Sequence, residues 1–295
     1  MLIITEEQVR ERLPMREAIR LMRETFAALR AGTARNQPRR RMFLSTGSVL
    51  HSMAGAWGKY FGTKVYATNP KHGAHFFFLL FDAATARPLA QIEANYLGQI
   101  RTGAASGYAT DLLAAPEAST LGIIGSGFQA RSQLGAMREV RRIREVRVWS
   151  RSDRKRLSFA EETGARAAGS AEEAVRGADI VVTATSAKDP VIESGWVAHG
   201  AHINAMGSNQ AQRRELPSDL IARAGLIAVD SIEQSKIEAG DLLLAPVDWS
   251  DPRLVELAGV DHRPAGSPIT IFKSTGLGVE DVSAAAYVYE SILRG

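Results

Sequence analysis

The sequence predicts an α/β protein in which a Rossmann-type, doubly wound parallel sheet forms one domain, and an α+β domain completed by the C-terminal helix forms the other. From residue 120 onward, strand-like and helix-like segments alternate, as they do around a parallel sheet. Residues 41–94 instead carry short β-rich runs separated by turn residues, a pattern typical of an antiparallel or mixed sheet. A glycine-rich phrase at residues 125–130 lies where the first strand of the alternating part meets its first helix.

The domain boundaries follow from this change of pattern. The 295 residues are enough for about two domains of roughly 150 residues each. We place the first domain at residues 1–115 and the second at residues 116–275, because residues 116–120 have the composition of a linker. Residues 276–295 hold a helical stretch beyond the last strand-like run, and we expect this helix to return to the first domain.

Composition and charge narrow the class of protein. Hydrophobic residues make up 45% and charged residues 23% of the chain, as in ordinary globular proteins. No apolar stretch approaches the roughly 18 residues that span a bilayer, and the acidic N-terminus is unlike a signal peptide. The absence of cysteine excludes a thiolate metal site and fits a reduced, cytoplasmic location. The net charge is +4, and the basic clusters at residues 39–41 and 138–156 are mainly solvated surface in our interpretation, so we expect no membrane or nucleic-acid partner.

The elements of the first domain follow from residue periodicity. Residues 5–31 carry apolar side chains at helical spacing, and Thr5 marks the helix start. Strands are expected at residues 41–44, 49–56, 62–67, 76–81 and 89–94, and a helix at residues 95–113. These elements give a thin core for a domain of this size. We therefore predict a twofold homodimer that covers the open sheet.

The second domain shows the alternation of a parallel sheet. Strands are expected at residues 121–124, 145–149, 180–185, 201–205, 225–229 and 269–272. Helices are expected from the glycine-rich turn to about residue 141, at residues 154–163 and at residues 171–177, with the terminal helix at residues 279–294.

The phrase GSGFQA, residues 125–130, has the form G-x-G-x-x-A and predicts a dinucleotide site. Gly125 permits the tight turn, Gly127 lets a pyrophosphate approach the backbone, and Ala130 allows helix and strand to pack closely. Phe128 and Gln129 open the helix whose N-terminus faces the phosphates. The preceding strand, the following helix and a second strand about twenty residues later make the motif more specific than an isolated glycine turn.

The end of the second strand indicates which dinucleotide is bound. Ser150, Arg151 and Ser152 stand where an NAD site usually has an acidic residue. A serine and an arginine suit the extra 2′-phosphate of NADP by hydrogen bond and by charge. We therefore predict NADP(H) as the preferred cofactor and NAD(H) as the alternative. The competing interpretation of Arg151 is an exposed loop arginine.

Two later strands end in polar or small residues. Thr185 ends one of them, and Asn204, Ala205 and Met206 lie at the end of the other. Because ligands bind beyond the C-terminal ends of the strands in such sheets, these residues are further candidates for cofactor binding.

Together these phrases resemble the ornithine cyclodeaminase/mu-crystallin family nearly from end to end. The most specific ones are RTGAAS (101–106), GSGFQA (125–130), HINAMGS (202–208), REL (214–216) and FKSTGLG (272–278). The family includes cyclodeaminases, alanine dehydrogenases, ketimine and cyclic-imine reductases, and a hormone-binding crystallin. The resemblance implies an N-terminal substrate and dimerisation domain, closed by the C-terminal helix, with a Rossmann domain between.

The resemblance also implies roles for individual side chains. Lys64 matches a catalytic and substrate-binding lysine, with Lys59 as the competing position. Arg101 matches an arginine that lies between the cofactor phosphate and the substrate.

The carboxylate-binding arginine of the family falls on residues 37–40. We choose Arg40 and leave Arg39 and Arg41 open, because a slip of one residue changes the face of a strand. The resemblance further assigns Thr102 and Ser274 to the cofactor and Thr275 to the substrate.

One departure from the family pattern concerns the reaction. Cyclodeaminases carry an aspartate soon after the glycine turn, and its carboxylate activates the water that attacks an imine. Asn209 takes that position in our alignment, and an asparagine cannot accept a proton as a carboxylate does.

The leading hypothesis is an NADPH-dependent reductase of a cyclic or linear 2-imino acid, of ketimine or 1-pyrroline-2-carboxylate type, with amino-acid dehydrogenation as the reverse reaction. The alternatives are an ornithine cyclodeaminase and a non-catalytic, NADPH-binding protein of crystallin type. We interpret His51, His72 and His75 as structural or pocket-wall residues rather than metal ligands, because no carboxylate lies near them in sequence.

Overall fold

A computed structural model describes residues 1–266 and 268–295. These residues form two compact units: unit 1 contains Met1–Ala104 and Gly276–Gly295, and unit 2 contains Ala105–Thr275. The predicted fold class is confirmed, because one unit is built on a mixed sheet with helices and the other on a parallel sheet. The first boundary between the units falls inside helix α3 (Asn95–Leu113), ahead of the expected linker at residues 116–120.

Unit 1 contains a six-stranded sheet with the order β1-β6-β5-β4-β3-β2. Its strands are β1 (Leu2–Ile4), β2 (Arg35–Phe43), β3 (Val49–Trp57), β4 (Tyr60–Asn69), β5 (Gly73–Asp82) and β6 (Pro88–Glu93). Neighbouring strands are antiparallel except β1 and β6, so the sheet is mixed, as predicted. The strand β1 was not predicted, because three residues carry no readable periodicity.

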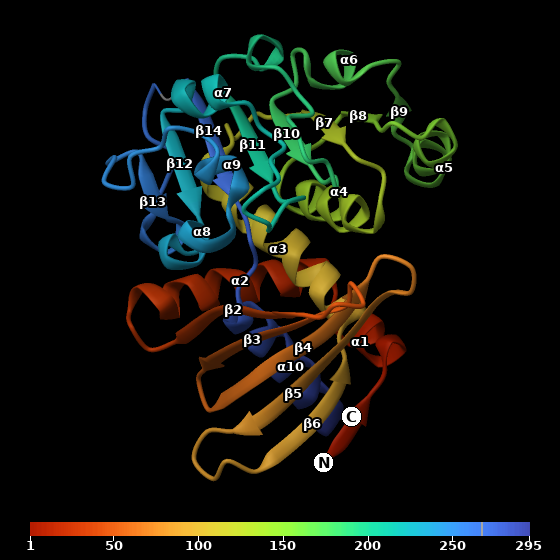
Figure 1. Cartoon of the computed structure of the whole chain (residues 1–295), viewed down its shortest axis with the longest axis vertical. Helices are drawn as coiled ribbons and strands as arrows, with labels where there is room; N and C mark the ends of the chain where they lie inside the picture. Colours follow the sequence, from red (N-terminus) through yellow and green to blue (C-terminus); the bar gives the residue numbers. More distant parts are fainter. Residues whose placement is uncertain (267) are drawn as a thin grey trace. The chain divides into compact units, whose positions relative to one another are not determined.

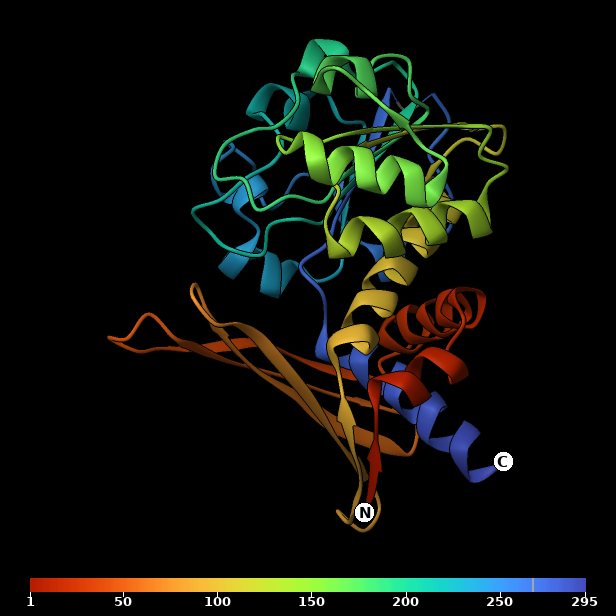
Figure 2. The same cartoon turned by 90° about the vertical axis from the view of Figure 1, so that its right-hand side faces the viewer.

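Three helices lie on one side of this sheet. They are α1 (Glu6–Arg12), α2 (Met15–Arg30) and α10 (Gly278–Leu293). Helix α10 packs on β3 and β4 and contacts α2. Figure 2 shows the three helices on the same side, and no helix among the described residues of unit 1 covers the opposite face.

The single helix expected over residues 5–31 is wrong: two helices occupy this segment. Pro14 is the N-cap of α2, with φ of −71°. Proline has no backbone N–H and disfavours the helical conformation of the residue before it, here Leu13. The apolar spacing continues across this break, which is why periodicity alone did not reveal it.

Helix α10 approaches strand β3 backbone to backbone. A Cβ atom on Gly55 would lie 2.5 Å from Val279 N, and one on Gly278 would lie 2.5 Å from Ala54 O. The two glycines therefore allow the helix to start directly on the sheet. Asn36 Oδ1 accepts a hydrogen bond from Val279 N at 3.3 Å, which also fixes the helix start to β2.

Unit 2 contains an eight-stranded parallel sheet with the order β13-β12-β14-β11-β10-β7-β8-β9. Its strands are β7 (Thr120–Ile124), β8 (Glu145–Trp149), β9 (Arg166–Ala167), β10 (Ile180–Thr183), β11 (Ala201–Ala205), β12 (Leu226–Val229), β13 (Leu254–Glu256) and β14 (Ile269–Lys273). From β7 the chain moves outward to β8 and β9, and then returns to β10 on the other side of β7. This reversal creates the topological switch point at which such sheets bind ligands.

The helices of unit 2 connect these strands (Figure 1). They are α4 (Phe128–Val140), α5 (Asp153–Thr163), α6 (Ala171–Val175), α7 (Ser218–Arg223), α8 (Ile232–Glu238) and α9 (Gly240–Leu243), with 3-10 turns at Ser194–Trp196 and Leu257–Gly259. The core contains the buried strand residues Ile124, Val181, Ile203 and Ile271. No helix that the structure describes has the length and apolar character needed to cross a membrane.

Candidate functional site

A pocket of about 1040 Å³ lies in unit 2 at the switch point of the sheet. Its walls come from the turn after β7, the segment after β8 and the segment after β10. The turn contributes Gly125, Gly127, Phe128 and Gln129, all of which were predicted to bind a cofactor.

The geometry of this turn fits a dinucleotide. Gly125 has φ of +112°, and a Cβ atom there would lie 2.4 Å from Ala184 O, so the position requires glycine. A Cβ atom on Gly127 would have no neighbour within 4 Å, which leaves open space against the backbone. Helix α4 begins directly after Gly127, and no side chain caps it. Its N-terminal N–H groups therefore suit the pyrophosphate of a dinucleotide.

The segment after β8 lines the pocket with Ser150, Arg151, Ser152 and Lys155. Ser150 Oγ lies 2.8 Å from Ser126 Oγ, so the serine hydroxyl is held at the pocket wall. Ser152 caps helix α5 by accepting a hydrogen bond from Lys155 N at 3.4 Å. Arg151 and Lys155 are both exposed, and together they offer two cations to a phosphate. Lys155 was missed from the sequence, although its place in the first turn after Ser152 was a readable signal.

A buried carboxylate ties together the ends of β10 and β11. Glu215 accepts hydrogen bonds from Thr183 Oγ1 at 2.9 Å, from Thr185 N and Oγ1 at 2.7 Å each, and from Gly207 N at 2.7 Å. Burial, reinforced by the neighbouring Asp241, raises the pKa of Glu215 above its usual value. A Cβ atom on Gly207 would lie 2.4 Å from Glu215 Oε1. The hydrogen bonds to Glu215 fix the position of Thr185, a predicted cofactor residue that lines the pocket.

Asn209 lies half-buried in the loop that follows β11. Lys273 holds this loop, because its Nζ donates to Ser208 O at 2.5 Å and pairs with Asp241 at 2.9 Å. Asp241 in turn accepts from Glu215 N at 2.6 Å and from Leu216 N at 2.9 Å. The carboxylates of Glu215 and Asp241 thus both accept hydrogen bonds from backbone N–H groups and hold the surrounding loops in place.

Several predicted cofactor residues lie inside unit 2 rather than on the pocket wall. Ala130 is fully buried where α4 packs on the sheet, and Ala205 is buried in β11. Asn204 is buried as well, and its Nδ2 donates to Thr110 Oγ1 at 2.8 Å. Met206 is half-buried, and its N donates to Thr183 O at 3.1 Å. These side chains shape the strand ends from within.

The end of β14 carries Ser274 and Thr275, both buried. Asp230 accepts hydrogen bonds from Thr275 N at 2.6 Å, from Thr275 Oγ1 at 2.9 Å and from Ser274 Oγ at 3.3 Å. Gln234 Nε2 donates to Thr275 Oγ1 at 3.2 Å. Both predicted residues are therefore held in fixed positions.

Unit 1 holds a buried cluster of charged side chains around Lys64. Lys64 Nζ lies 2.7 Å from Asp281 Oδ2, and Arg101 Nε donates to Asp281 Oδ1 at 2.9 Å. Arg101 Nη1 also donates to Glu280 Oε2 at 2.7 Å. Burial, with a contribution from the charge of Arg101, lowers the pKa of Lys64 to about 8. Thr102, in the same helix α3, has its Oγ1 donating to Gly98 O at 2.7 Å.

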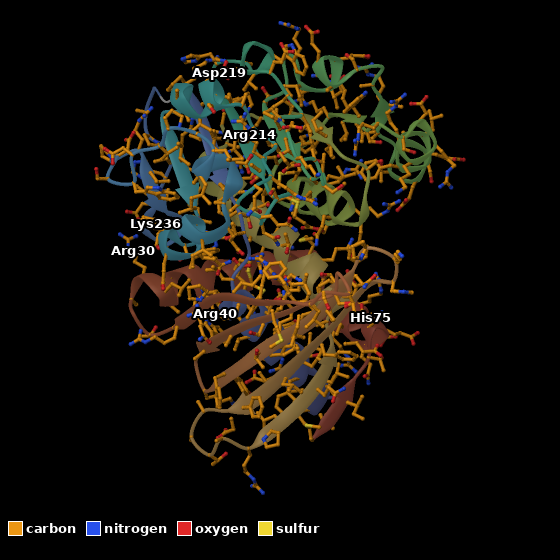
Figure 3. The ribbon with its side chains drawn as sticks, viewed as in Figure 1. Arg30, Arg40, His75, Arg214, Asp219 and Lys236 are labelled. Atoms are coloured by element: carbon orange, nitrogen blue, oxygen red, sulfur yellow. The ribbon has the colours of Figure 1, made fainter. Side chains whose placement is uncertain are left out.

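The structure favours Arg39 over Arg40 as the third cation of this cluster. Arg40, labelled in Figure 3, is exposed. Its register with Ser52 places it on the face of the sheet opposite Lys64. A register shift between Gln37 and Arg40 turns Arg39 inward, where it is only 5% exposed. Arg39 is close enough to Lys64 to contribute to lowering its pKa. A β-bulge of this kind is invisible in the sequence, and it moved the position by one residue.

His51 lies on the same face of the sheet as Lys64 and stacks on a neighbouring ring. Its ring stacks on Tyr66 with centroids 4.1 Å apart, and its Nε2 lies 3.1 Å from Thr68 Oγ1. Burial, together with the charges of Arg41 and Arg39, lowers the pKa of His51 to about 4, so the ring is neutral at pH 7. Within residues 1–266 and 268–295, no group of three histidine or carboxylate side chains could hold a metal ion.

The buried ionic residues Glu215, Lys273, Glu280 and Asp281 were missed from the sequence. For three of them a signal existed, because they are charged residues beside an apolar run: Lys273 closes a buried strand, and Glu280 and Asp281 open an apolar helix. Charged side chains are almost never fully buried unless they are paired.

The fold and the pocket first assign the chain to a general class of proteins. The parallel sheet, its switch point and the glycine turn make unit 2 a Rossmann-type dinucleotide-binding unit. The model of the ornithine cyclodeaminase/mu-crystallin family matches residues 1–295, and the chain belongs to this family.

The relatives of this chain include an alanine dehydrogenase and Delta(1)-pyrroline-2-carboxylate reductases. The chain is 34% identical to an alanine dehydrogenase of Archaeoglobus fulgidus, over 99% of this chain and 95% of the relative. It is 41% identical to a Delta(1)-pyrroline-2-carboxylate reductase of Bacillus cereus, over 73% of this chain and 70% of the relative. The solved structure of the Delta(1)-pyrroline-2-carboxylate reductase of Thermococcus litoralis, in complex with NADH and L-proline, matches with a TM-score of 0.93 and 30% identity, covering 100% of this chain and 98% of that one.

Proposed function

We propose that the chain is an NAD(P)H-dependent oxidoreductase that reduces a cyclic 2-imino acid to the corresponding amino acid. The observation that carries this proposal is the buried cluster of Lys64, Arg101 and Arg39 in a chain that also holds a dinucleotide pocket. The names of the reductases from Bacillus cereus and Thermococcus litoralis support the same substrate class.

The residues of the pocket fit the parts of a nicotinamide dinucleotide. The open backbone at Gly127 and the start of α4 suit the pyrophosphate. Ser150, Arg151, Ser152 and Lys155 suit a 2′-phosphate, so NADPH is the preferred form in this proposal. When bound, the nicotinamide supplies the hydride.

The cationic side chains of unit 1 suit the substrate. Arg39 and Arg101 carry guanidinium groups, which bind a carboxylate with paired hydrogen bonds. Lys64 has its pKa lowered to about 8, so it is mostly protonated at neutral pH yet releases its proton more readily than an exposed lysine. In this proposal Lys64 supplies the proton that the nitrogen of the substrate gains as its carbon accepts the hydride.

Two alternatives remain in competition with this proposal. An ornithine cyclodeaminase needs a base beside the α-carbon, and Asn209 carries no charge for that role. A protein that only binds NADPH and a carboxylate ligand would keep the pocket but would not catalyse conversion of the ligand.

One assay separates the three. We expect NADPH to be oxidised when 1-pyrroline-2-carboxylate is added, which is followed by the absorbance of the reduced nicotinamide. Ammonia release from ornithine without net NADPH change would identify the cyclodeaminase. NADPH binding without oxidation, over a panel of cyclic imines and 2-oxo acids with amines, would identify the binding protein.

The proposed assembly is a twofold homodimer through the uncovered face of the unit 1 sheet. Met42, Leu50 and Phe77 lie on this face and are 59%, 40% and 45% exposed. Exposed apolar side chains gathered on one face indicate a protein interface. The absence of cysteine supports a cytoplasmic location as a further part of the proposal.

A further inference from the structure

The charged cluster of unit 1 draws on three elements that are distant in sequence. Strand β4 supplies Lys64, helix α3 supplies Arg101, and helix α10 supplies Glu280 and Asp281. The side chains of Lys64 and Arg101 are 4% and 5% exposed, and those of the two carboxylates are fully buried. Gly276 has φ of +78°, and a Cβ atom there would lie 2.5 Å from Arg101 Nη1, so the turn before α10 leaves room for the guanidinium.

The two carboxylates play different parts. Glu280 contacts Arg101 at 2.7 Å. Asp281 bridges both cations: its Oδ1 accepts from Lys64 Nζ and from Arg101 Nε at 2.9 Å each, and its Oδ2 lies 2.7 Å from Lys64 Nζ. Burial opposes ionisation of Asp281, but the charges of Arg101 and Lys64 outweigh it and hold the pKa of Asp281 below its usual value.

The two carboxylates and the two cations of α3 and β4 form one continuous set of contacts. Asp281 contacts both Lys64 and Arg101, whereas Glu280 contacts Arg101. Asp281 is therefore the group through which the two cations are held together.

We propose that Asp281 is a positioning residue for the reaction: it fixes Lys64 and Arg101 relative to each other and keeps the proton on Lys64 until the substrate needs it. This inference rests on the proposed function, in which Lys64 supplies a proton to the substrate nitrogen. Asp281 acts through Lys64 and does not itself touch the substrate in this proposal.

The physical reason is the surroundings of Lys64. The titratable and charged groups that face it are Arg39 from β2, His51 from β3, Tyr66 from its own strand, Arg101 from α3 and Asp281 from α10. Of these, Arg39 and Arg101 repel its proton and Asp281 attracts it. A buried ammonium group that lost an adjacent anion would give up its proton at a lower pH.

The direct test is the titration of Lys64 in the full chain. The sequence contains seven lysines, so carbon-13 labelling of lysine side chains gives few NMR signals, and Lys64→Met assigns the one from Lys64. We expect Asp281→Asn to lower the pKa of Lys64 by about 1–3 units, the scale of a lost opposite charge at this distance. Glu280→Gln is the matched control on the same helix, and it should shift that pKa much less, since Glu280 contacts Arg101 instead. Equal shifts in the two variants, or none in Asp281→Asn, would overturn the proposal.

A second variant covers the case in which Asp281→Asn does not fold. Asp281→Glu keeps the charge but moves it by one methylene, so we expect the pKa of Lys64 to stay near its original value while kcat for imine reduction falls at least about tenfold. An unchanged kcat in a folded Asp281→Glu variant would contradict a positioning role.

The pH profile connects the titration to turnover. The alkaline limb of kcat/KM should move to lower pH in Asp281→Asn, together with the pKa of Lys64 measured by NMR. If the chain reduces no imine at all, the proposed function fails, while the NMR titration still decides whether Asp281 holds the proton on Lys64.

Discussion

At the scale of single residues, we propose that the side chains after β8 set the choice of cofactor. Arg151 and Lys155 are both exposed at the pocket wall, and Ser150 and Ser152 are held by local hydrogen bonds. The serines are therefore held in place by the protein itself, and in our proposal the two cations supply most of the discrimination between NADPH and NADH. Arg151 extends from the loop itself, whereas Lys155 lies in the first turn of α5.

Arg151→Ala should weaken NADPH binding by roughly 1–3 kcal/mol and leave NADH binding nearly unchanged, because only NADPH carries the 2′-phosphate. Calorimetric titration with both cofactors measures the difference. Arg154→Ala, which removes a neighbouring arginine that does not line the pocket, is the control. Equal affinity of the unaltered chain for NADH and NADPH would show that the preference for NADP is wrong.

In our proposal, Asn209 decides the reaction class at the same scale. We expect the unaltered chain to convert little or no ornithine to proline, because an amide cannot serve as the base for deamination. Asn209→Asp should raise any trace of that activity, and Lys64→Ala should abolish both deamination and imine reduction. Proline and ammonia formed from ornithine are measured for each variant. Efficient proline formation by the unaltered chain would mean that another group acts as the base.

At the scale of elements, the contact of α10 with β3 depends on glycine. Gly55→Ala would place a methyl group 2.5 Å from Val279 N, so the helix must shift. We expect a loss of about 1–3 kcal/mol in the free energy of unfolding, the usual cost of overpacking, and a fall in kcat because α10 carries Asp281. Gly195→Ala, with nothing within 4 Å of the added carbon, is the control. Denaturant unfolding and initial rates give both quantities. A Gly55→Ala variant as stable and active as the control would show that the sheet absorbs the methyl group.

The sequence predicted elements well where the signal is local. The helix expected at residues 95–113 corresponds to α3, and the dinucleotide turn followed from six consecutive residues. The sequence failed where a single residue redirects a regular pattern, as at Pro14 and at the bulge before Arg40. The short strands β9 and β13 were missed because two or three residues show no period.

The sequence predicted only part of the site, again because local signals can be read from the sequence and contacts between distant residues cannot. The turn and the loop after β8 are continuous segments, so the sequence alone was enough to group the residues that line the pocket. Asp281 is 217 residues from Lys64, and nothing in either local phrase indicates that the two meet. Arg39 is buried and Arg40 exposed because the strand register depends on pairing with β3, which no single-strand pattern reveals.

At the scale of the whole molecule, the uncovered sheet face predicts assembly. Phe77→Glu combined with Met42→Glu should convert the dimer to a monomer at micromolar concentration, because two charges would be buried in an apolar interface. Sedimentation velocity measures the change. Leu157→Glu, which alters an exposed leucine of unit 2, should leave the dimer intact. A monomeric unaltered chain would remove the predicted assembly.

Unit 1 is built from two segments that are far apart in the sequence, and this has a consequence for biosynthesis. Residues 105–275 are contiguous, so the ribosome releases everything that unit 2 needs before α10 has emerged. Unit 1 begins first but is completed last, because Gly276–Gly295 supplies the helix that packs on β3 and β4 and the anions that pair with Lys64 and Arg101. A nascent chain that is stalled or cut before residue 276 would therefore carry a finished dinucleotide-binding unit and an immature partner with uncompensated cations and an exposed apolar sheet. Quality-control proteases and chaperones would meet this protein chiefly through its N-terminal third, although the missing piece is at the C-terminus.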